Sequence, residues 1–263
     1  MKILNDIIKQ NIGKMYSAYD EQKVILTYLT KIQHKKIVVD IAAQDGVNMS
    51  NTYSLYRAGY SGLAVECNSK FFASLAKSYK RLDQVMLSKL YVYPENVVQL
   101  LEAYQIPYDF GFLNFDIDGY DHFVLNQLLT QYRPSLICVE INEKIPYPIK
   151  FTVKYSRDYV WDRSHFYGQS IAQLYILCER YNYDLVELHY NNAFLIPAEQ
   201  NKLFPSLQPG EAYKKGYKCQ PDRTQKFPWN KDMDAALDLS PDKALAFIND
   251  YFSKYEGQYE VSI

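Results

Sequence analysis

Short apolar runs alternate with helix-length segments through the first half of the chain. Five of the runs have the length and composition of strands, and they cover Ile37–Ile41, Gly62–Glu66, Gln84–Leu87, Phe110–Phe115 and Ser135–Ile141. The spacing of apolar residues predicts helices after the first four runs, over Ser50–Ala58, Phe71–Arg81, Pro94–Tyr104 and His122–Leu129. Regular alternation of strand and helix indicates a parallel sheet with right-handed crossovers.

The second half of the chain breaks this alternation. A loose, aromatic stretch over Pro146–Tyr167 leads into a helix at Ser170–Tyr181, and two strands follow closely, Tyr183–His189 and Ala193–Ile196. Their tight connection through an Asn-Asn pair makes these two strands antiparallel. The sequence therefore predicts an α/β, Rossmann-like fold with a seven-stranded, mostly parallel sheet, an antiparallel last strand and helices on both faces.

Three segments are expected along the chain. Residues 1–35 carry apolar residues at helical spacing and form an N-terminal helical segment. Residues 36–197 hold the sheet and its helices. Residues 198–263 are rich in Pro, Lys and Gln until a final helix over Asp242–Tyr255, and we expect them to pack on the core as an extension.

Charge and composition narrow the classes of partner. The 29 basic and 30 acidic residues nearly cancel, so no overall charge favours a nucleic acid. The first residues, MKILNDIIKQ, lack the apolar core and cleavage site of a secretory signal, and no apolar run approaches the roughly 20 residues of a membrane span. The four cysteines are scattered and form no CxxC pair. We therefore expect a reduced, cytoplasmic protein.

Candidate ligand-binding residues gather where the parallel strands end, because ligands of open α/β sheets bind beyond the carboxyl ends of the strands. These ends carry Asp40–Gly46, Glu66–Asn68, Ser88 and Asp116–Gly119. Glu66 follows Asp40 by 26 residues, at the tip of the second strand, where a carboxylate can accept hydrogen bonds from both hydroxyls of a ribose. The alternative is a surface acid that caps the following helix.

The first turn departs from the dinucleotide-binding fingerprint. It reads D-I-A-A-Q-D-G from Asp40, so Ala42 and Gln44 occupy the positions of the two earlier glycines and only Gly46 remains. A pyrophosphate needs the closest backbone approach, at a helix N-terminus. The departure therefore favours a cofactor without phosphates, S-adenosylmethionine, over NAD.

Three stretches of the sequence resemble FkbM-type methyltransferases and their bacterial and viral relatives. They read VVDIAAQDGVNMSNTYSLYRAGYSGLAVECN, FLNFDIDGYDHFVLNQLL followed by YRPSLICVEIN, and WDRSHFYGQSIAQL with YNYDLVELHYNNAFLIP. The resemblance covers roughly residues 36–197 in the right order. It implies a class I, S-adenosylmethionine-dependent methyltransferase that O-methylates a hydroxyl of a small molecule, sugar or glycan.

Carried onto matching positions, the resemblance also implies a set of cofactor-binding residues. The methionine moiety would be lined by Asp40, Ala42, Asp45 and Gly46. Glu66 would bind the ribose, and the adenine would be bordered by Cys67 and Ser88. Asp116 would lie under the sulfonium and the acceptor.

A hydroxyl acceptor needs a base or a metal, since a free alcohol is a weak nucleophile. Asp116 and Asp118 end the fourth strand, Glu140 and Asn142 end the fifth, and such oxygen-bearing groups suit Mg²⁺ or Ca²⁺. Metal-dependent O-methyltransferases are similar in placing acids and an amide at these strand ends. Asp116, Glu140 and Asn142 are therefore candidate metal ligands, and a helix-capping turn at Asp118 with an Asx-turn at Asn142 is the alternative.

Candidate catalytic residues are Asp116, Asp118 and His165. His165 lies in the segment DRSHFYG before a helix, and a histidine is a suitable general base near neutral pH. An exposed loop histidine is the alternative, in which case His122, at the start of another helix, could serve as the base.

Aromatic residues concentrate between the fifth strand and the next helix, at Tyr147, Tyr155, Trp161, Phe166 and Tyr167. Aromatic faces stack on sugars and on planar rings, so this stretch is a candidate acceptor wall, with ordinary packing of a long loop as the alternative.

Two other function classes stay open. A Rossmann-type oxidoreductase, or another NAD- or nucleotide-binding protein, would share Glu66 but would be expected to carry the glycine-rich turn that this chain lacks. A non-catalytic binding member of the fold would be expected to have lost the acids of the crevice, which are intact here.

Overall fold

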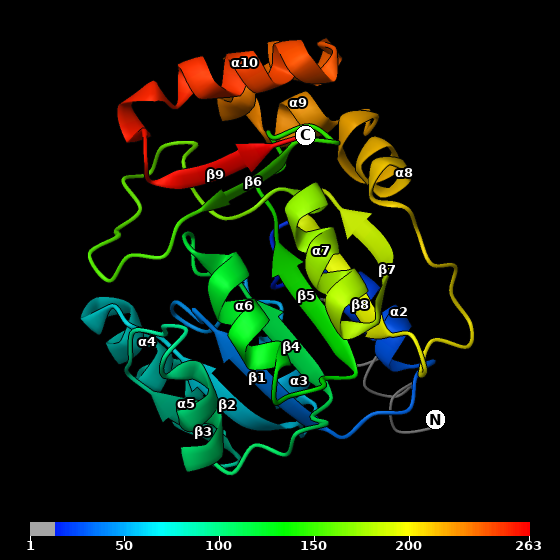
Figure 1. Ribbon diagram of the computed structural model, residues 1–263. Helices are drawn as coiled ribbons and strands as arrows, with labels where there is room; N and C mark the ends of the chain where they lie inside the picture. The colour runs from blue at the N-terminus through cyan, green and yellow to red at the C-terminus, as the bar shows by residue number, and fades with distance from the viewer. Residues whose placement is uncertain (1–13) are drawn as a thin grey trace. The chain divides into compact units, whose positions relative to one another are not determined.

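The computed structural model describes residues 14–263 (Figure 1). The first part of the expected N-terminal helical segment, residues 1–13, lies outside the described residues. The later part forms α2 (Glu21–Leu29), whose apolar side chains Ile25 and Leu29 are buried. Helical spacing thus places one face of α2 in the core.

Seven strands form the main sheet. They are β1 (Ile37–Ile41), β2 (Ser61–Val65), β3 (Val85–Ser88), β4 (Phe112–Phe115), β5 (Leu136–Glu140), β7 (Tyr183–His189) and β8 (Asn192–Pro197). Their order across the sheet is β3-β2-β1-β4-β5-β8-β7, with six strands parallel and β8 antiparallel. This is the strand order of the Rossmann-like methyltransferase fold, so the predicted fold class is confirmed.

Helices separate most of the strands along the chain. The α-helices after α2 are α3 (Tyr53–Arg57), α4 (Ser69–Tyr79), α5 (Val97–Ala103), α6 (Asp121–Leu129), α7 (Ile171–Tyr181), α8 (Pro209–Tyr213), α9 (Arg223–Lys226) and α10 (Pro241–Tyr251). A π-helical turn, η1 (Lys214–Lys218), follows α8 directly. Short 3₁₀ turns are η2 (Pro228–Asn230), η3 (Asp234–Asp238) and η4 (Ser253–Tyr255).

The chain divides into two compact units. Unit 1 holds the chain up to Asp116 together with Gln127–Cys138 and Glu199–Leu203. Unit 2 holds Ile117–Asn126, Val139–Ala198 and Phe204–Ile263.

In unit 1 the parallel register brings the carboxyl ends of neighbouring strands together. Asp40 on β1 lies opposite Asn114 on β4, and Val65 on β2 lies opposite Ser88 on β3. β1 and β2 are buried except at their first residues, because both faces of these strands are covered. The polar residues that follow the strands are therefore gathered at one edge of the sheet.

Unit 2 contains a second, two-stranded sheet that the sequence did not predict. β6 (Lys150–Val153) pairs antiparallel with β9 (Tyr259–Ser262), within stretches expected to be a loose loop and the end of the chain. Both strands have four residues, which is too short for a clear periodic pattern, and they pair across more than a hundred residues of sequence. The expected final helix ends at Tyr251, and η4 follows it.

In unit 2, α10 lies next to the β6–β9 pair (Figure 1). An aromatic-rich cluster of buried side chains from these elements and from the loop before α7 packs together there. Phe151 of β6 is fully buried, and its ring lies 5.4 Å from that of Phe252. Phe166, from the loop before α7, stacks on Tyr255 of η4 with ring centroids 3.9 Å apart. The C-terminal segment is thus part of the core of unit 2.

No helix within residues 14–263 is both long and apolar enough to cross a membrane.

Candidate functional site

The turn after β1 has the left-handed backbone typical of a glycine-rich turn, although only one of its three left-handed residues is glycine. Ala42, Gln44 and Gly46 have φ angles of 69°, 50° and 76°, all in the left-handed region. A residue with a Cβ costs roughly 1–2 kcal/mol in this region, so Ala42 and Gln44 need compensating contacts. The turn therefore has the backbone that the sequence, read for glycines alone, did not indicate.

Gly46 is the one position in this turn where a side chain has no room. A Cβ there would lie 2.4 Å from Leu75 Cδ1 and 2.5 Å from Tyr79 Cε1, both on α4. The hydroxyl of Tyr79 donates a 2.9 Å hydrogen bond to the Gly46 carbonyl. Close packing of the turn against α4 therefore requires glycine at this position.

Glu66, just after β2, connects this turn to the second strand. Its side chain is buried, Oε2 accepts a 2.8 Å hydrogen bond from the Gln44 amide, and Oε1 accepts one of 2.6 Å from the Asn68 amide. Each carboxylate oxygen has two lone pairs, so these bonds leave capacity for further donors. Asn68 in turn accepts from the Lys70 and Phe71 amides and caps α4. The acid is thus fixed at the edge of the sheet, which excludes the expected alternative of a merely surface-exposed acid.

A cavity of about 740 Å³ opens beside Glu66, at the ends of β2 and β3. Its lining residues come from the two segments that follow these strands: Cys67, Asn68, Ser69, Lys70, Lys89, Leu90, Tyr91, Tyr93 and Asn96. Cys67, predicted to border the adenine, is among them. Ser88 is buried next to Lys89, and its carbonyl accepts a hydrogen bond from the Glu66 amide.

A second cavity in unit 1, of about 520 Å³, lies near the amino ends of the strands and holds none of the predicted site residues.

Asp40 is buried in a polar network that the sequence analysis recognised only in part. Thr52 Oγ1 donates to Oδ2 at 2.6 Å and Asn114 Nδ2 donates to Oδ1 at 2.9 Å. Asn51 Nδ2 donates in turn to Asn114 Oδ1 at 3.0 Å. Sequence reasoning missed Asn114. An asparagine inside the apolar strand FLNF is nevertheless a signal, because a buried amide requires hydrogen-bond partners.

Burial raises the pKa of Asp40 to about 6, because removal from water favours the neutral form of the carboxyl group. The hydrogen bonds from Thr52 and Asn114 oppose this rise, and the charges of Asp116 and Glu66 add to it. Asp40 therefore changes its protonation state within the physiological pH range.

The side chain of Asp45 stabilises the main chain that follows it. Its Oδ1 accepts hydrogen bonds from the Val47 and Asn48 amides at 2.9 and 2.8 Å. Burial opposes ionisation, but these bonds outweigh it and lower the pKa of Asp45. All of the residues expected to bind the cofactor belong to unit 1, and Asp116 ends the first of its three segments.

Two of the acids proposed at the acceptor lie together in unit 2. Asp118 and Glu140 each present a carboxylate oxygen, and these oxygens lie within 4.8 Å of each other. Asn191 Nδ2 donates to Glu140 Oε1 at 2.6 Å. Two carboxylates at this spacing are hard oxygen donors of the kind that Mg²⁺ and Ca²⁺ take, so the donor set suits such an ion.

The turn around Asp118 is held by Asp121, which sequence reasoning missed. The buried carboxylate of Asp121 accepts hydrogen bonds from the Ile117 and Gly119 amides at 3.0 and 2.8 Å. The Tyr159 hydroxyl donates to the Asp118 carbonyl at 3.2 Å. Asp118 itself has a φ of 54°, which asparagine and aspartate tolerate better than most residues.

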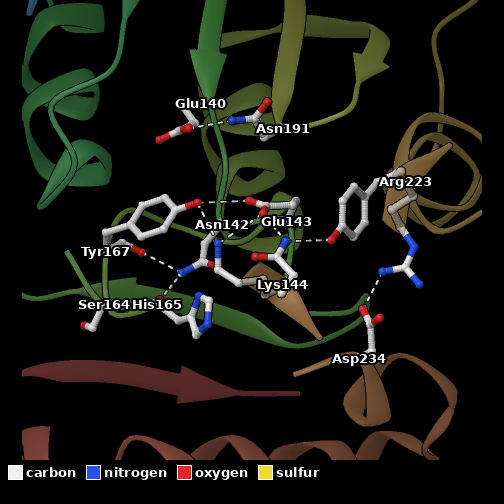
Figure 2. Close-up of polar contacts among 12 residues, drawn as sticks. Glu140, Asn142, Glu143, Lys144, Ser164, His165, Tyr167, Asn191, Arg223 and Asp234 are labelled. Carbon is white, nitrogen blue, oxygen red and sulfur yellow. Dashed lines mark hydrogen bonds and ion pairs between the residues drawn. The ribbon is translucent and has the colours of Figure 1, made fainter. Parts of the chain in front are cut away.

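Asn142 is fully buried and holds the loop that precedes α7. Its Nδ2 donates to the His165 and Tyr167 carbonyls, both at 2.9 Å (Figure 2). Its Oδ1 is buried and has no hydrogen-bond partner within residues 14–263. The observed role of the amide is therefore to position the main chain of this loop.

A buried ion pair lies next to this amide. Glu143 and Lys144 are at most 2% exposed, with Lys144 Nζ 3.1 Å from Glu143 Oε1, and Figure 2 shows Tyr167 pointing toward both. Asn230 donates a 2.6 Å hydrogen bond to Glu143. Burial favours the neutral acid, but the Lys144 charge and the Asn230 hydrogen bond outweigh it and lower the pKa of Glu143. The pair is therefore charged and internally compensated.

The two candidate histidine bases differ in their contacts. His122 Nδ1 donates to Gln169 Oε1 at 3.1 Å, and its Nε2 accepts from Gln173 Nε2 at 3.2 Å, so both ring nitrogens are engaged. His165 contacts one side-chain partner through Nε2, Asp232 Oδ1 at 3.2 Å. His165 is thus the better placed of the two to accept a proton.

The expected acceptor wall is only partly exposed. Phe166 and Tyr167 are buried, the first in the aromatic cluster and the second against Glu143. Trp161 is 36% exposed, and its Nε1 donates to the Ser164 carbonyl at 2.8 Å. Tyr147 is also exposed. Ordinary packing therefore accounts for two of these rings, and Trp161 is hydrogen-bonded and partly exposed.

Comparisons with known proteins add little to this geometry. Neither the protein-family models nor the curated proteins gave a match. Similar solved structures include the glycopeptide N-methyltransferase MtfA with S-adenosylmethionine, at 13% identity over 73% of this chain and 94% of that one, TM-score 0.40. A SAM-dependent methyltransferase from Aquifex aeolicus has 11% identity over 74% and 98%, TM-score 0.42. An O-methyltransferase from Bacillus cereus with SAH has 16% over 64% and 88%, TM-score 0.38. These structural neighbours are methyltransferases, but the fold assignment rests on the strand order of this chain.

Substitution of Gly46 should damage unit 1 far more than substitution of Ala42. We expect Gly46→Ala to lower the free energy of unfolding by about 2–4 kcal/mol, from the left-handed φ and the contact with α4 together. Ala42→Gly should change it by less than about 1 kcal/mol, because relief of strain is offset by greater freedom of the unfolded chain. Urea unfolding measures the free energy of unfolding of both variants. Equal changes in the two would contradict the crowding of Gly46 against α4.

The raised pKa of Asp40 predicts a loss of stability as the pH rises. The folded pKa of about 6 exceeds the ordinary value of 3.8, so this group's contribution is complete below pH 3.8 and is lost by pH 6 and above. From pH 4 to pH 8 the wild type should lose roughly 2 kcal/mol relative to Asp40→Asn, which cannot ionise. Unfolding curves of the two proteins that keep a constant separation across this range would refute the assignment.

Proposed function

We propose that this chain is an S-adenosylmethionine-dependent methyltransferase of the FkbM-like kind that methylates a hydroxyl of a sugar or glycan. The observation that carries the proposal is the left-handed turn after β1, bonded to the buried Glu66 beside an open cavity. In an open α/β sheet this edge is where a nucleoside-containing ligand binds. The turn keeps Gly46 but lacks the two earlier glycines of a pyrophosphate-binding turn.

The proposed roles in unit 1 follow from these contacts. The turn from Asp40 to Gly46 binds the methionine moiety, Glu66 accepts hydrogen bonds from the ribose, and the cavity beginning at Cys67 takes the adenine. Asp116, directly after β4, is proposed to lie toward the sulfonium. The cofactor supplies a methyl group already activated by positive sulfur, so the protein mainly aligns the acceptor and removes its proton.

A sugar hydroxyl is the proposed acceptor because of Trp161. Its side chain donates a hydrogen bond to Ser164, its ring lies at a steep angle 5.8 Å from that of Tyr167, and it is partly exposed in unit 2. Apolar faces of sugars stack on such rings. The near-zero net charge agrees with a neutral acceptor. We further propose that residues 36–197 form the catalytic core, with 1–35 and 198–263 as additions to it, in the cytoplasm.

A divalent cation is a second part of the proposal. Asp118 and Glu140, whose carboxylate oxygens lie within 4.8 Å of each other, would hold it. When bound, such an ion would polarise the acceptor hydroxyl. Asn142 Nδ2 is bonded to the loop carbonyls, so only its Oδ1, which is buried and unpaired within residues 14–263, is open to the ion expected there.

Cofactor identity is tested by titration calorimetry with S-adenosylhomocysteine and NAD. We expect the first to bind and the second not. Glu66→Ala should weaken S-adenosylhomocysteine at least tenfold, or about 1.4 kcal/mol, because the ribose hydroxyls lose their acceptor. Glu102→Ala, which removes an exposed acid of α5 in the same unit, is the matched control and should bind as the wild type does. Tighter binding of NAD would favour the oxidoreductase alternative, and absence of both would favour a non-catalytic protein.

Acceptor and metal are tested together by a methyl-transfer screen across saccharides, with and without EDTA. We expect transfer to a saccharide hydroxyl, a loss of at least tenfold in chelator, and recovery on addition of Mg²⁺ or Ca²⁺. Asp118→Asn should lower the rate of methyl transfer and raise the ion concentration that gives half of the maximal rate. Full activity in EDTA would end the metal proposal and leave the methyltransferase proposal standing.

A further inference from the structure

His165 and two residues of the C-terminal segment form a hydrogen-bonded series in unit 2. Asp232, between η2 and η3, lies with Oδ1 3.2 Å from His165 Nε2. Its other oxygen, Oδ2, accepts a hydrogen bond from the Tyr251 hydroxyl at the end of α10. The series therefore runs from a tyrosine through a carboxylate to an imidazole.

The series fixes which nitrogen of the imidazole carries the proton. A carboxylate only accepts hydrogen bonds, so Nε2 must be the donor and Nδ1 carries the lone pair in the neutral ring. Nδ1 of His165 has no hydrogen-bond partner within residues 14–263. The side chain is 16% exposed, so the ring is mostly enclosed but reachable.

The main chain at His165 is held from the opposite side. Asn142 Nδ2 donates to the His165 carbonyl, and Figure 2 shows this contact beside the buried Glu143 and Lys144. The hydroxyls of Ser164 and Tyr255 are hydrogen-bonded at 2.8 Å. A backbone and a ring that are both held reduce the motion of the free nitrogen, which is what a positioned base requires.

A contribution to stability does not explain the contact between His165 and Asp232. Asp232 is 54% exposed, and an ion pair open to water contributes about 0–1 kcal/mol. The more specific consequence of this contact is geometric. A base whose second ring nitrogen is held by a third group is arranged as in an activated catalytic pair.

We propose that Asp232 is a positioning residue that holds His165 as the general base for the acceptor hydroxyl. This inference rests on the proposed methyltransferase function. The Nδ1 lone pair takes the hydroxyl proton while the acceptor oxygen bonds to the methyl carbon. The electrons of the broken carbon–sulfur bond return to sulfur, and the imidazolium, paired with Asp232, then releases its proton to water.

The charges around His165 set the protonation state that this role needs. The groups facing it are Lys144, Asp232 and Glu143, together with the Tyr251 phenol. Burial lowers the pKa of His165 below 6.5, Lys144 lowers it further, and Asp232 and Glu143 oppose the change. The ring is therefore neutral, and able to accept a proton, at pH 7.

The test is Asp232→Asn, which keeps the shape of the side chain and removes its charge. We expect kcat to fall about tenfold with little change in KM, because the imidazolium loses its partner in the transition state. The acid limb of the pH–rate profile should move to lower pH, since loss of the carboxylate lowers the pKa of His165. Asp250→Asn, at an exposed acid of α10, is the control and should leave both unchanged.

NMR of the imidazole nitrogens provides a readout independent of activity, and only four histidines need assignment. The wild type should show the Nε2–H tautomer for His165, and Asp232→Asn should lower its pKa. If tautomer, pKa and pH profile stay unchanged in Asp232→Asn, the inference is overturned even though the enzyme is active. A wild type that methylates no hydroxyl overturns the proposed function instead, and the NMR arm then still decides whether Asp232 orients His165.

Discussion

The hydrogen bond from the Gln44 amide to the Glu66 carboxylate is the contact on which the geometry of unit 1 depends. It joins the turn after β1 to the tip of β2, and it lies within a turn where two residues other than glycine have left-handed backbones. That conformation costs roughly 1–2 kcal/mol for each such residue. A hydrogen bond to a charged group contributes about 1.5–3 kcal/mol, enough to offset most of this strain. The same carboxylate that is proposed to bind ribose thus also maintains the turn that is proposed to bind methionine.

Two buried acids show how neighbours decide the sign of a pKa shift. Burial acts in the same direction on Asp40 and on Glu143, toward the neutral form. Asp40 has neutral partners, Thr52 and Asn114, whose hydrogen bonds do not outweigh burial, and its pKa rises. Glu143 has Lys144 beside it, and its pKa falls. Unit 1 therefore holds an acid that titrates near neutral pH, and unit 2 holds a permanent internal ion pair.

The C-terminal segment has a structural role in unit 2 that extends to the candidate acceptor loop. Tyr255 stacks on Phe166 and bonds to Ser164, and Asp232 bonds to His165. Asn230 reaches the buried Glu143. Each contact fixes a different residue of the loop before α7 or of the segment after β5. The loop is thereby held by residues that follow it in sequence by 67 to 91 positions.

The sequence by itself determined the sheet and the acids at its edge. Alternation of apolar runs and helical segments is a local property, so the seven strands of the main sheet and their Rossmann-like order could be predicted. The positions of Asp40 and Glu66 at strand ends could be predicted as well. Only the tertiary structure decided the left-handed turn at Ala42, the β6–β9 pair and the contact of His165 with Asp232. A backbone angle at a residue with a Cβ is set by the partners that compensate its strain, and pairings across a hundred residues leave no periodic trace in either segment.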